Sequence, residues 1–242
     1  MTENVNQQFW IIIDQKSNKI QILKAKIVKW GLFFVDLGYI NIFLIAIVLA
    51  ISIGPNGYNP YYNAISALGW SEITPFPFLF DLKAYLGSFL LILTVLFAKK
   101  KLIHENHLGD KRSREKIIPK NLIRFGVIMG IIGAIGYIFV GVFNIDRGGP
   151  NGIYHYLFAV VLFGGFIISI STFSLYILIY KIKFPKIYAI FGLIVPFLSV
   201  IMWRITEILL FEWIAFFSIL GFLMPFQSKR IIQKLLTLTK GG

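Results

Sequence analysis

Long runs of apolar residues alternate along the chain with short segments rich in lysine and arginine. A helix needs about 20 apolar residues to cross the roughly 30 Å hydrocarbon layer of a membrane. Six runs approach or exceed this length, and we expect each to form a membrane-spanning helix. The predicted spans are 31–53, 82–98, 122–143, 153–180, 187–203 and 205–226. The pattern therefore predicts an all-α, polytopic membrane protein, a six-transmembrane-helix bundle whose last two spans form a tight antiparallel hairpin.

The composition excludes two other classes of protein. Hydrophobic residues make up 57% of the 242 residues and charged residues only 14%, whereas soluble domains carry about 25% charged residues. Aromatic residues make up 17%, which excludes an intrinsically disordered chain. Cysteine is absent, so disulfides and thiolate metal sites are excluded, and we expect neither a metal nor a cofactor.

Basic residues are concentrated in every second connection between the predicted spans. The N-terminal segment, the segments 99–124 and 181–186, and the C-terminal tail together hold 21 of the 24 lysines and arginines. Basic residues near short loops stay in the cytoplasm during insertion, so we expect both termini to be cytoplasmic and the protein to reside in the plasma membrane. The net charge of +13 then indicates membrane lipids as partners, and nucleic acid is not needed to explain it.

The chain divides into a membrane domain and two basic flanks. Residues 31–226 form the predicted transmembrane domain, and residues 1–30 and 227–242 are predicted cytoplasmic segments. Ile20, Leu23 and Ile27 have helical spacing with lysines between them, which favours an interfacial helix. A solvated lead-in to the first span is the alternative.

Glycines line the third predicted span, so another helix can approach its backbone closely. They are Gly126, Gly130, Gly133, Gly136 and Gly141. Gly164 and Gly165 in the fourth span are candidates for the facing surface, and we expect the contact to lie within one chain. Trp70, Trp203 and Trp213 lie near span ends, where we expect them to act as interfacial anchors.

Polar residues gather at the predicted outer ends of the spans, where they cost free energy unless they are paired or hydrated. The candidate site residues are Ser66, Asp146, His155 and Arg204, with Asn63, Asp81 and Glu207 in supporting positions. Serine, histidine and an acid are the side chains that hydrolysis needs, whereas arginine suits a phosphate or carboxylate. In the alternative interpretation these residues form a structural cap. Asp146 then pairs with Arg147 or Arg204, His155 bonds to the first outer loop, and Glu207 pairs with Arg204.

Several short motifs resemble a known membrane family. The first is the loop Gly57-Tyr58-Asn59-Pro60 followed by Ile65-Ser66-Ala67-Leu68-Gly69, and the later ones are Gly141-Val142-Phe143-Asn144-Ile145-Asp146, His155, and Arg204 with Trp213 nine residues later. Together they resemble the uncharacterised multi-helix membrane family catalogued as domain of unknown function 998, over roughly residues 31–226. The resemblance implies a multi-helix membrane architecture and carries over no activity.

Four functions are compatible with these features. Our main hypothesis is an outward-facing polar pocket that binds a lipid headgroup or a small polar ligand. The second is an accessory or scaffold subunit of a larger membrane complex, suggested by the small size and the glycine-lined helices. The third is a membrane hydrolase or transferase that acts on lipid through Ser66, Asp146 and His155. The fourth, a transporter bent at Pro196, is disfavoured because the centres of the spans are largely apolar.

Overall fold

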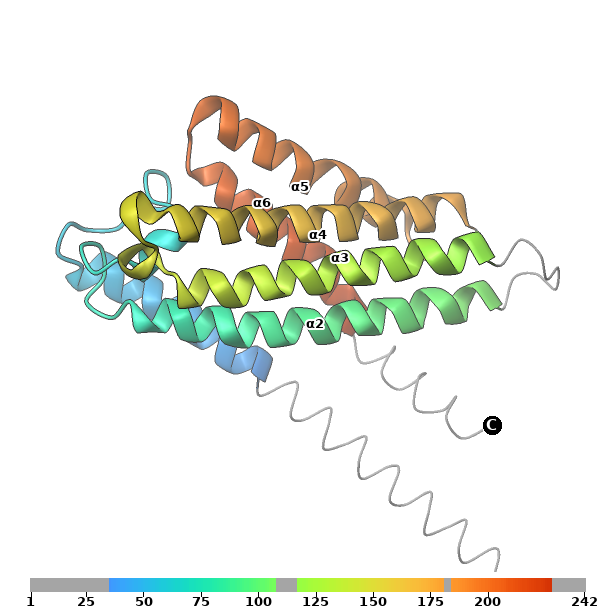
Figure 1. Ribbon diagram of the computed structural model, residues 1–242, viewed down its shortest axis with the longest axis horizontal. Coiled ribbons are helices and arrows are strands. Elements are labelled where there is room, and N and C mark those ends of the chain that lie inside the picture. Colours follow the sequence, from blue (N-terminus) through green and yellow to red (C-terminus); the bar gives the residue numbers. More distant parts are fainter. Residues whose placement is uncertain (1–34, 108–116, 181–183, 228–242) are drawn as a thin grey trace, which may run out of the picture. The chain divides into compact units, whose positions relative to one another are not determined.

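Helices account for all the regular secondary structure in the part of the chain that the structure describes. This computed structural model describes residues 35–107, 117–180 and 184–227. The long helices are Val35–Ile53, α2 (Phe78–His107), α3 (Ile117–Val142), α4 (Ile153–Ile179), α5 (Lys186–Thr206) and α6 (Leu210–Leu223) (Figure 1). The described part of the chain also contains four short 3₁₀ turns: η1 (Ile65–Gly69), η2 (Ile145–Arg147), η3 (Pro150–Gly152) and η4 (Met224–Gln227). The predicted interfacial helix and the C-terminal tail from 228 lie outside the described residues.

Within the described residues, five helices are long and apolar enough to cross a membrane, which agrees with the predicted all-helical, multi-pass class. Their apolar parts are Val35–Ile53, Phe78–Ile103, Lys120–Val142, Pro150–Ile179 and Lys186–Thr206. The sixth predicted span is shorter than expected, because its apolar helix covers only Leu210–Phe226. Glu207 adopts a left-handed conformation with φ of 57° and caps α5, so the chain turns before α6 begins. The tight connection predicted between the last two spans is confirmed.

The second and third helices extend beyond the predicted spans. The predicted second span, 82–98, is bounded by charged residues that interrupt the apolar run, whereas α2 covers Phe78–His107. Lysine and glutamate are good helix formers, so charged residues end the apolar segment without ending the helix. Hydropathy therefore identifies the membrane-embedded part of a helix better than its ends.

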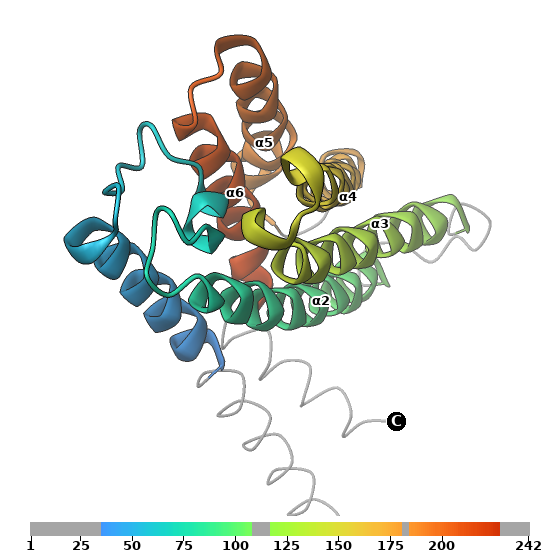
Figure 2. The ribbon, with the colours of Figure 1, turned by 60° about the vertical axis from the view of Figure 1, so that its left-hand side comes forward.

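Close packing of α3 against α4 forms the centre of the unit Gly38–Gln227, with α2 on the other side of α3 (Figures 1 and 2). A Cβ atom built on Gly136 would lie 2.7 Å from the backbone nitrogen of Leu162, and one on Gly133 would lie 2.9 Å from that of Phe166. Only glycine allows two backbones to approach this closely. The prediction that the glycines of the third span pack within the chain is confirmed.

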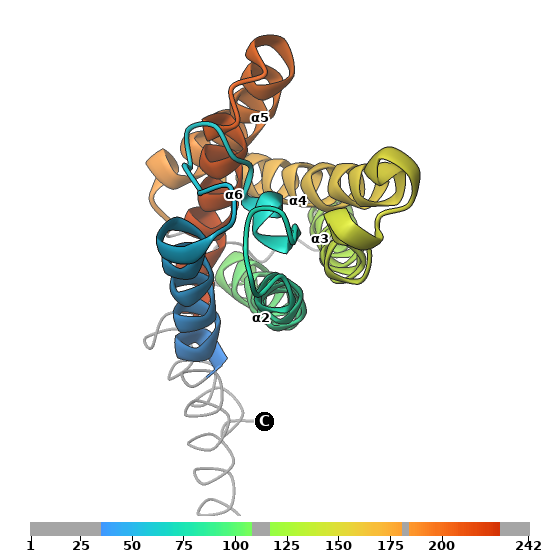
Figure 3. The same cartoon turned by 90° about the vertical axis from the view of Figure 1, so that its left-hand side faces the viewer.

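The segment between Ile53 and Phe78 folds over one end of these helices, which we call the loop end. Figure 3 looks onto this end and shows η1 lying among α2, α3, α4 and α6. Two hydrogen bonds hold the backbone just before η1. The Tyr58 hydroxyl donates to the carbonyl of Ala64 at 2.9 Å, and the Trp213 indole N–H donates to the carbonyl of Asn63 at 3.1 Å. These contacts position the side chain of Ser66.

Large apolar side chains point away from the helix contacts. Val160, Ile187 and Ile205 are among the most exposed, at 70%, 68% and 73%. Exposed apolar surface of this kind is unusual in water-soluble proteins, whereas a membrane-spanning helix presents it to lipid.

Candidate functional site

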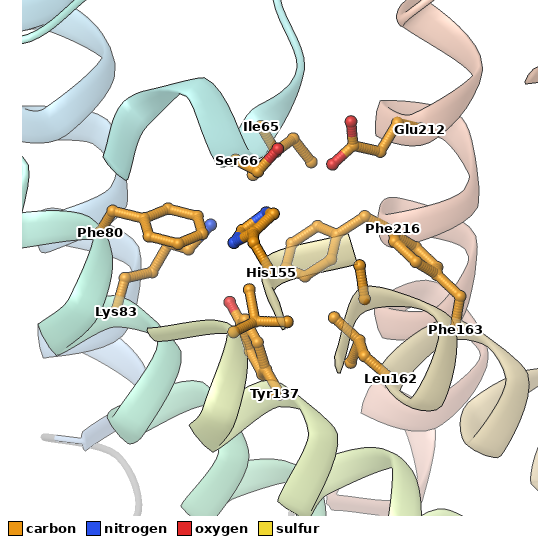
Figure 4. A pocket seen from close by; sticks show the side chains of 12 residues that line it. Ile65, Ser66, Phe80, Lys83, Tyr137, His155, Leu162, Phe163, Glu212 and Phe216 are labelled. Carbon is orange, nitrogen blue, oxygen red and sulfur yellow. The ribbon is translucent and has the colours of Figure 1, made fainter. Parts of the chain in front are cut away.

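A small cavity lies beneath η1, where four helices meet at the loop end. Its volume is about 20 Å³, which is enough for one water-sized group. The lining residues are Ile65, Ser66, Phe80, Lys83, Tyr137, Val140, His155, Ala159, Leu162, Phe163, Glu212 and Phe216 (Figure 4). The cavity therefore combines an apolar wall with ionisable side chains from α2, α4 and α6.

Lys83 is the least expected of these side chains. A charged residue so close to the start of the predicted span 82–98 is usually hydrated, but Lys83 is completely buried in α2. Its Nζ atom lies 4.5 Å from the ring centroid of Phe43, 4.7 Å from that of Phe80 and 5.1 Å from that of Phe216. Cation–π contacts stabilise the ammonium group, but Nζ makes no hydrogen bond within the described residues. All the donors of this ammonium group are therefore available.

Glu212 places a carboxylate on the same cavity from the first turn of α6. Its side chain is 5% exposed and lies within hydrogen-bonding reach of the backbone N–H of Ser66. Atom Oε2 is buried and has no hydrogen-bond partner among the residues that the structure covers. Glu212 and Lys83 attract each other electrostatically, yet they do not form an ion pair, since none of their charged atoms approach within 4.0 Å. The carboxylate of Glu212 also affects Tyr58 in the loop before η1. Burial of the Tyr58 hydroxyl, together with the nearby negative charge of Glu212, raises the pKa of Tyr58 above its ordinary value.

His155 and Ser66, two of the predicted site residues, do line one cavity. Gly152 has φ of 68° and begins α4, so His155 lies in the first turn and is buried. Its Nδ1 atom lies 2.8 Å from the carbonyl oxygen of Phe143. A carbonyl can only accept a hydrogen bond, so Nδ1 carries the proton and the neutral ring keeps Nε2 as its acceptor. The alternative in which His155 bonds to the first loop is wrong.

Asp146 does not line the cavity. Its carboxylate accepts hydrogen bonds from the backbone N–H of Ser71, at 3.0 and 3.2 Å, and from the Ser71 hydroxyl at 3.0 Å. Neither Arg147 nor Arg204 pairs with it within the described ranges, so both pairings suggested for the structural cap are wrong. Asp146 instead ties the turn after α3 to the segment that covers the cavity.

Replacing Asp146 with alanine is expected to loosen this covering segment by about 1 kcal/mol, since the lost bonds to a charged group are partly exposed to water. The chain has no natural cysteine, so a single cysteine at the buried position of Ala67 can report the opening. We expect labelling by a polar maleimide to become about fivefold faster. Arg204→Ala is the matched control, and equal acceleration in both variants would contradict the assignment.

Asp81 joins the start of α2 to the end of α3. Its carboxylate forms an ion pair with Arg147 and accepts a hydrogen bond from the Asn144 side chain at 3.0 Å. The Arg147 guanidinium also donates to the carbonyls of Gly141 and Val142, at 2.9 and 3.2 Å. These contacts satisfy carbonyls at the C-terminus of α3, so this network is structural.

Asp81→Ala is expected to lower the free energy of unfolding by about 2 kcal/mol, because it removes two hydrogen bonds between charged or polar groups. The loss stays moderate because the Arg147 side chain is 53% exposed and water can hydrate it. Unfolding in mixed micelles with increasing sodium dodecyl sulfate measures the change. Glu72→Ala, at an exposed acidic position in the covering segment, should change stability by less than about 0.5 kcal/mol.

The remaining predicted site residues do not reach the cavity. Arg204 and Glu207 are exposed at the end of α5, and no ion pair joins them within the described chain. The side-chain oxygen of Asn63 accepts from the backbone N–H of Asn59 at 2.8 Å, so Asn63 shapes the loop. Trp213 is buried at 7% exposure and donates to Asn63, so its prediction as an interfacial anchor is wrong.

Sequence reasoning missed the two charges that define this cavity. Lys83 is the second residue of the predicted span 82–98, where a charge is easily assigned to water, and Glu212 lies about two helical turns into the span 205–226. The usable signal is that Glu212 lies between Phe211 and Trp213 and that Lys83 lies between Leu82 and Ala84, since an ionisable residue inside an apolar segment is a functional candidate. No family model, curated protein or solved structure matches the chain, so the resemblance to domain of unknown function 998 stays a prediction.

Proposed function

We propose that this protein is a multi-pass membrane protein that binds a small polar ligand, or the polar end of a lipid headgroup, in the cavity at its loop end. One observation carries the proposal. Lys83 and Glu212 are buried, of opposite charge type and not ion-paired; both line the same cavity, and each has a polar atom with no hydrogen-bond partner among the described residues. Leaving such groups unpartnered costs several kcal/mol of folding stability. A role in binding a ligand explains why both side chains are present despite this cost.

The proposed topology places the loop end outside the cell and both termini in the cytoplasm. Lys99, Lys100 and Lys101 lie near the opposite end of α2, and Lys186 begins α5 there, as the positive-inside rule requires of the cytoplasmic side. Single cysteines at Tyr62 and at Lys100 test the topology in intact cells. We expect an impermeant maleimide to label the first and not the second, and the reverse result would invert the proposal.

The binding test is retention of ligand by the purified protein. Protein in nanodiscs of mixed lipids is released into a mass spectrometer under native conditions, and the retained species are compared between wild type and Glu212→Gln. We expect the variant to lose a species that wild type keeps. Lys101→Met is the matched control, because Lys101 lies on α2, the helix that carries Lys83, and its Nζ is 4.6 Å from the ring of Phe184 at the other end. Identical retention in all three proteins would overturn the proposal.

A second candidate, a lipid hydrolase or transferase, is favoured by the shared position of Ser66 and His155. The Phe143 carbonyl fixes the tautomer of His155 so that Nε2 can accept a proton, as a general base must. Asp146 has no part in this version, because it lies on Ser71. Release of fatty acid or headgroup from labelled lipid by wild type, but not by Ser66→Ala or His155→Ala, would support it, and equal rates would reject it. The accessory-subunit hypothesis stays a prediction, to be tested by purification in mild detergent.

A further inference from the structure

We propose that the group held between Lys83 and Glu212 is a hydroxyl, which accepts a hydrogen bond from Lys83 Nζ and donates one to Glu212 Oε2. The hydroxyl comes from water or from the terminal alcohol of a polyol headgroup. The inference specifies the chemistry of the ligand in the proposed function. It rests on that function only where the hydroxyl belongs to a lipid headgroup, and not where it belongs to water. It stands on the two unpartnered atoms and the cavity they share.

The hydrogen-bonding roles of the two side chains restrict the ligand. The ammonium group of Lys83 can only donate, and the carboxylate of Glu212 can only accept. A phosphate or carboxylate ligand would satisfy the first and face the second with like charge. An ammonium or guanidinium ligand would satisfy Glu212 and face Lys83 with like charge. A hydroxyl both accepts and donates, so it satisfies both atoms at once.

The charges and the size of the cavity also favour a hydroxyl as the ligand group. When both side chains are ionised, the cavity holds one cation and one anion, so a neutral ligand group needs no further compensation. Its volume of about 20 Å³ admits one oxygen-sized group, since a water needs roughly 10–15 Å³ by the same measure. A trimethylammonium group, as in a choline headgroup, is too large to enter.

Neighbouring side chains complete the surroundings of this oxygen. Tyr137 faces the cavity from α3, where its hydroxyl lies 3.5 Å from that of Tyr39, and Ser66 faces it from η1. His155 lines the cavity from α4, and its Nδ1 is already occupied by Phe143. The remaining acceptor, Nε2, can take the second hydrogen of a water molecule, whereas an alcohol has no second hydrogen to donate. Both sources therefore fit the cavity.

An experimental structure of the wild-type protein in two kinds of nanodisc tests the proposal. One contains phosphatidylglycerol, whose headgroup ends in free hydroxyls, and the other contains only phosphatidylcholine, which has none. We expect density for one oxygen within about 2.5–3.2 Å of both Lys83 Nζ and Glu212 Oε2. Density continuous with a lipid only in phosphatidylglycerol identifies the headgroup, and the same isolated density in both identifies water. A direct Lys83–Glu212 ion pair, or density that contacts only one of the two atoms, would overturn the inference.

Lipid retention separates this inference from the proposed function. If the headgroup supplies the hydroxyl, wild type should retain phosphatidylglycerol over phosphatidylcholine by about tenfold, the equivalent of one hydrogen bond to a charged group. Glu212→Gln should lose this preference, and Lys101→Met should keep it. If no ligand is retained but an isolated oxygen bridges the two side chains in both nanodiscs, ligand binding fails and the hydroxyl inference stands. If a ligand without a hydroxyl is retained at the site, the proposal of ligand binding stands and the hydroxyl inference fails.

Discussion

Replacing Gly165 with leucine is expected to lower the free energy of unfolding by at least about 3 kcal/mol, the upper end of the range for overpacked cores. A Cβ atom at this position would lie 2.5 Å from the backbone nitrogen of Gly133 and 2.8 Å from the backbone oxygen of Met129. Backbone atoms inside a helix cannot move aside as a flexible side chain can, so α3 and α4 would have to separate. Unfolding in mixed micelles with sodium dodecyl sulfate, followed by tryptophan fluorescence, measures the loss.

The neighbouring glycine provides the control for this prediction. No atom lies within 4 Å of a Cβ atom built on Gly164, so Gly164→Leu points the same added side chain into open space. We expect a change of less than about 1 kcal/mol, since leucine also improves helix propensity relative to glycine. A similar loss in both variants would show that leucine disturbs α4 generally, and would contradict a specific α3–α4 backbone contact.

These two glycines also show how far the sequence predicts the fold. A run of glycines in one apolar span indicates close helix packing, and that prediction is confirmed for α3 and α4. The sequence does not tell which of Gly164 and Gly165 meets the partner, because adjacent residues on a helix point about 100° apart and the rotation of each helix depends on its tertiary contacts. Helix existence follows from local hydropathy, whereas helix rotation does not.

The candidate site also contains some residues that the sequence predicts and others that it does not. Ser66 and His155 were predicted from residue type and position near the loop end, and they line one cavity. Asp146 and Arg204 are of suitable chemistry but point elsewhere, since Asp146 bonds to Ser71 and Arg204 is exposed. A charge near the end of an apolar run is usually hydrated, so the sequence gives no reason to expect Lys83 inside the bundle. Its burial depends on rings from three other helices, those of Phe43, Tyr137 and Phe216, which a single sequence does not place.

The interaction of Lys83 with Glu212 gives the second large expected effect. Lys83→Met is expected to lower the free energy of unfolding by about 3–5 kcal/mol, because it leaves the Glu212 carboxylate buried without its opposite charge. Glu212→Gln should cost less, about 1–3 kcal/mol. The glutamine oxygen can still accept from the Ser66 backbone N–H, and the ammonium group of Lys83 keeps its contacts with the aromatic rings. Unfolding in mixed micelles compares the variants.

The double variant distinguishes electrostatic coupling from simple loss of packing. With Lys83→Met and Glu212→Gln combined, neither charge remains to be left uncompensated, so the total loss should be smaller than the sum of the two single losses by about 1–3 kcal/mol. Pairing Lys101→Met with Glu212→Gln gives the control, since these residues lie at opposite ends of the helices and their effects should add to within about 0.5 kcal/mol. Additive losses for Lys83 and Glu212 as well would mean that the two side chains share a cavity without interacting. The cavity could then not hold one ligand between them.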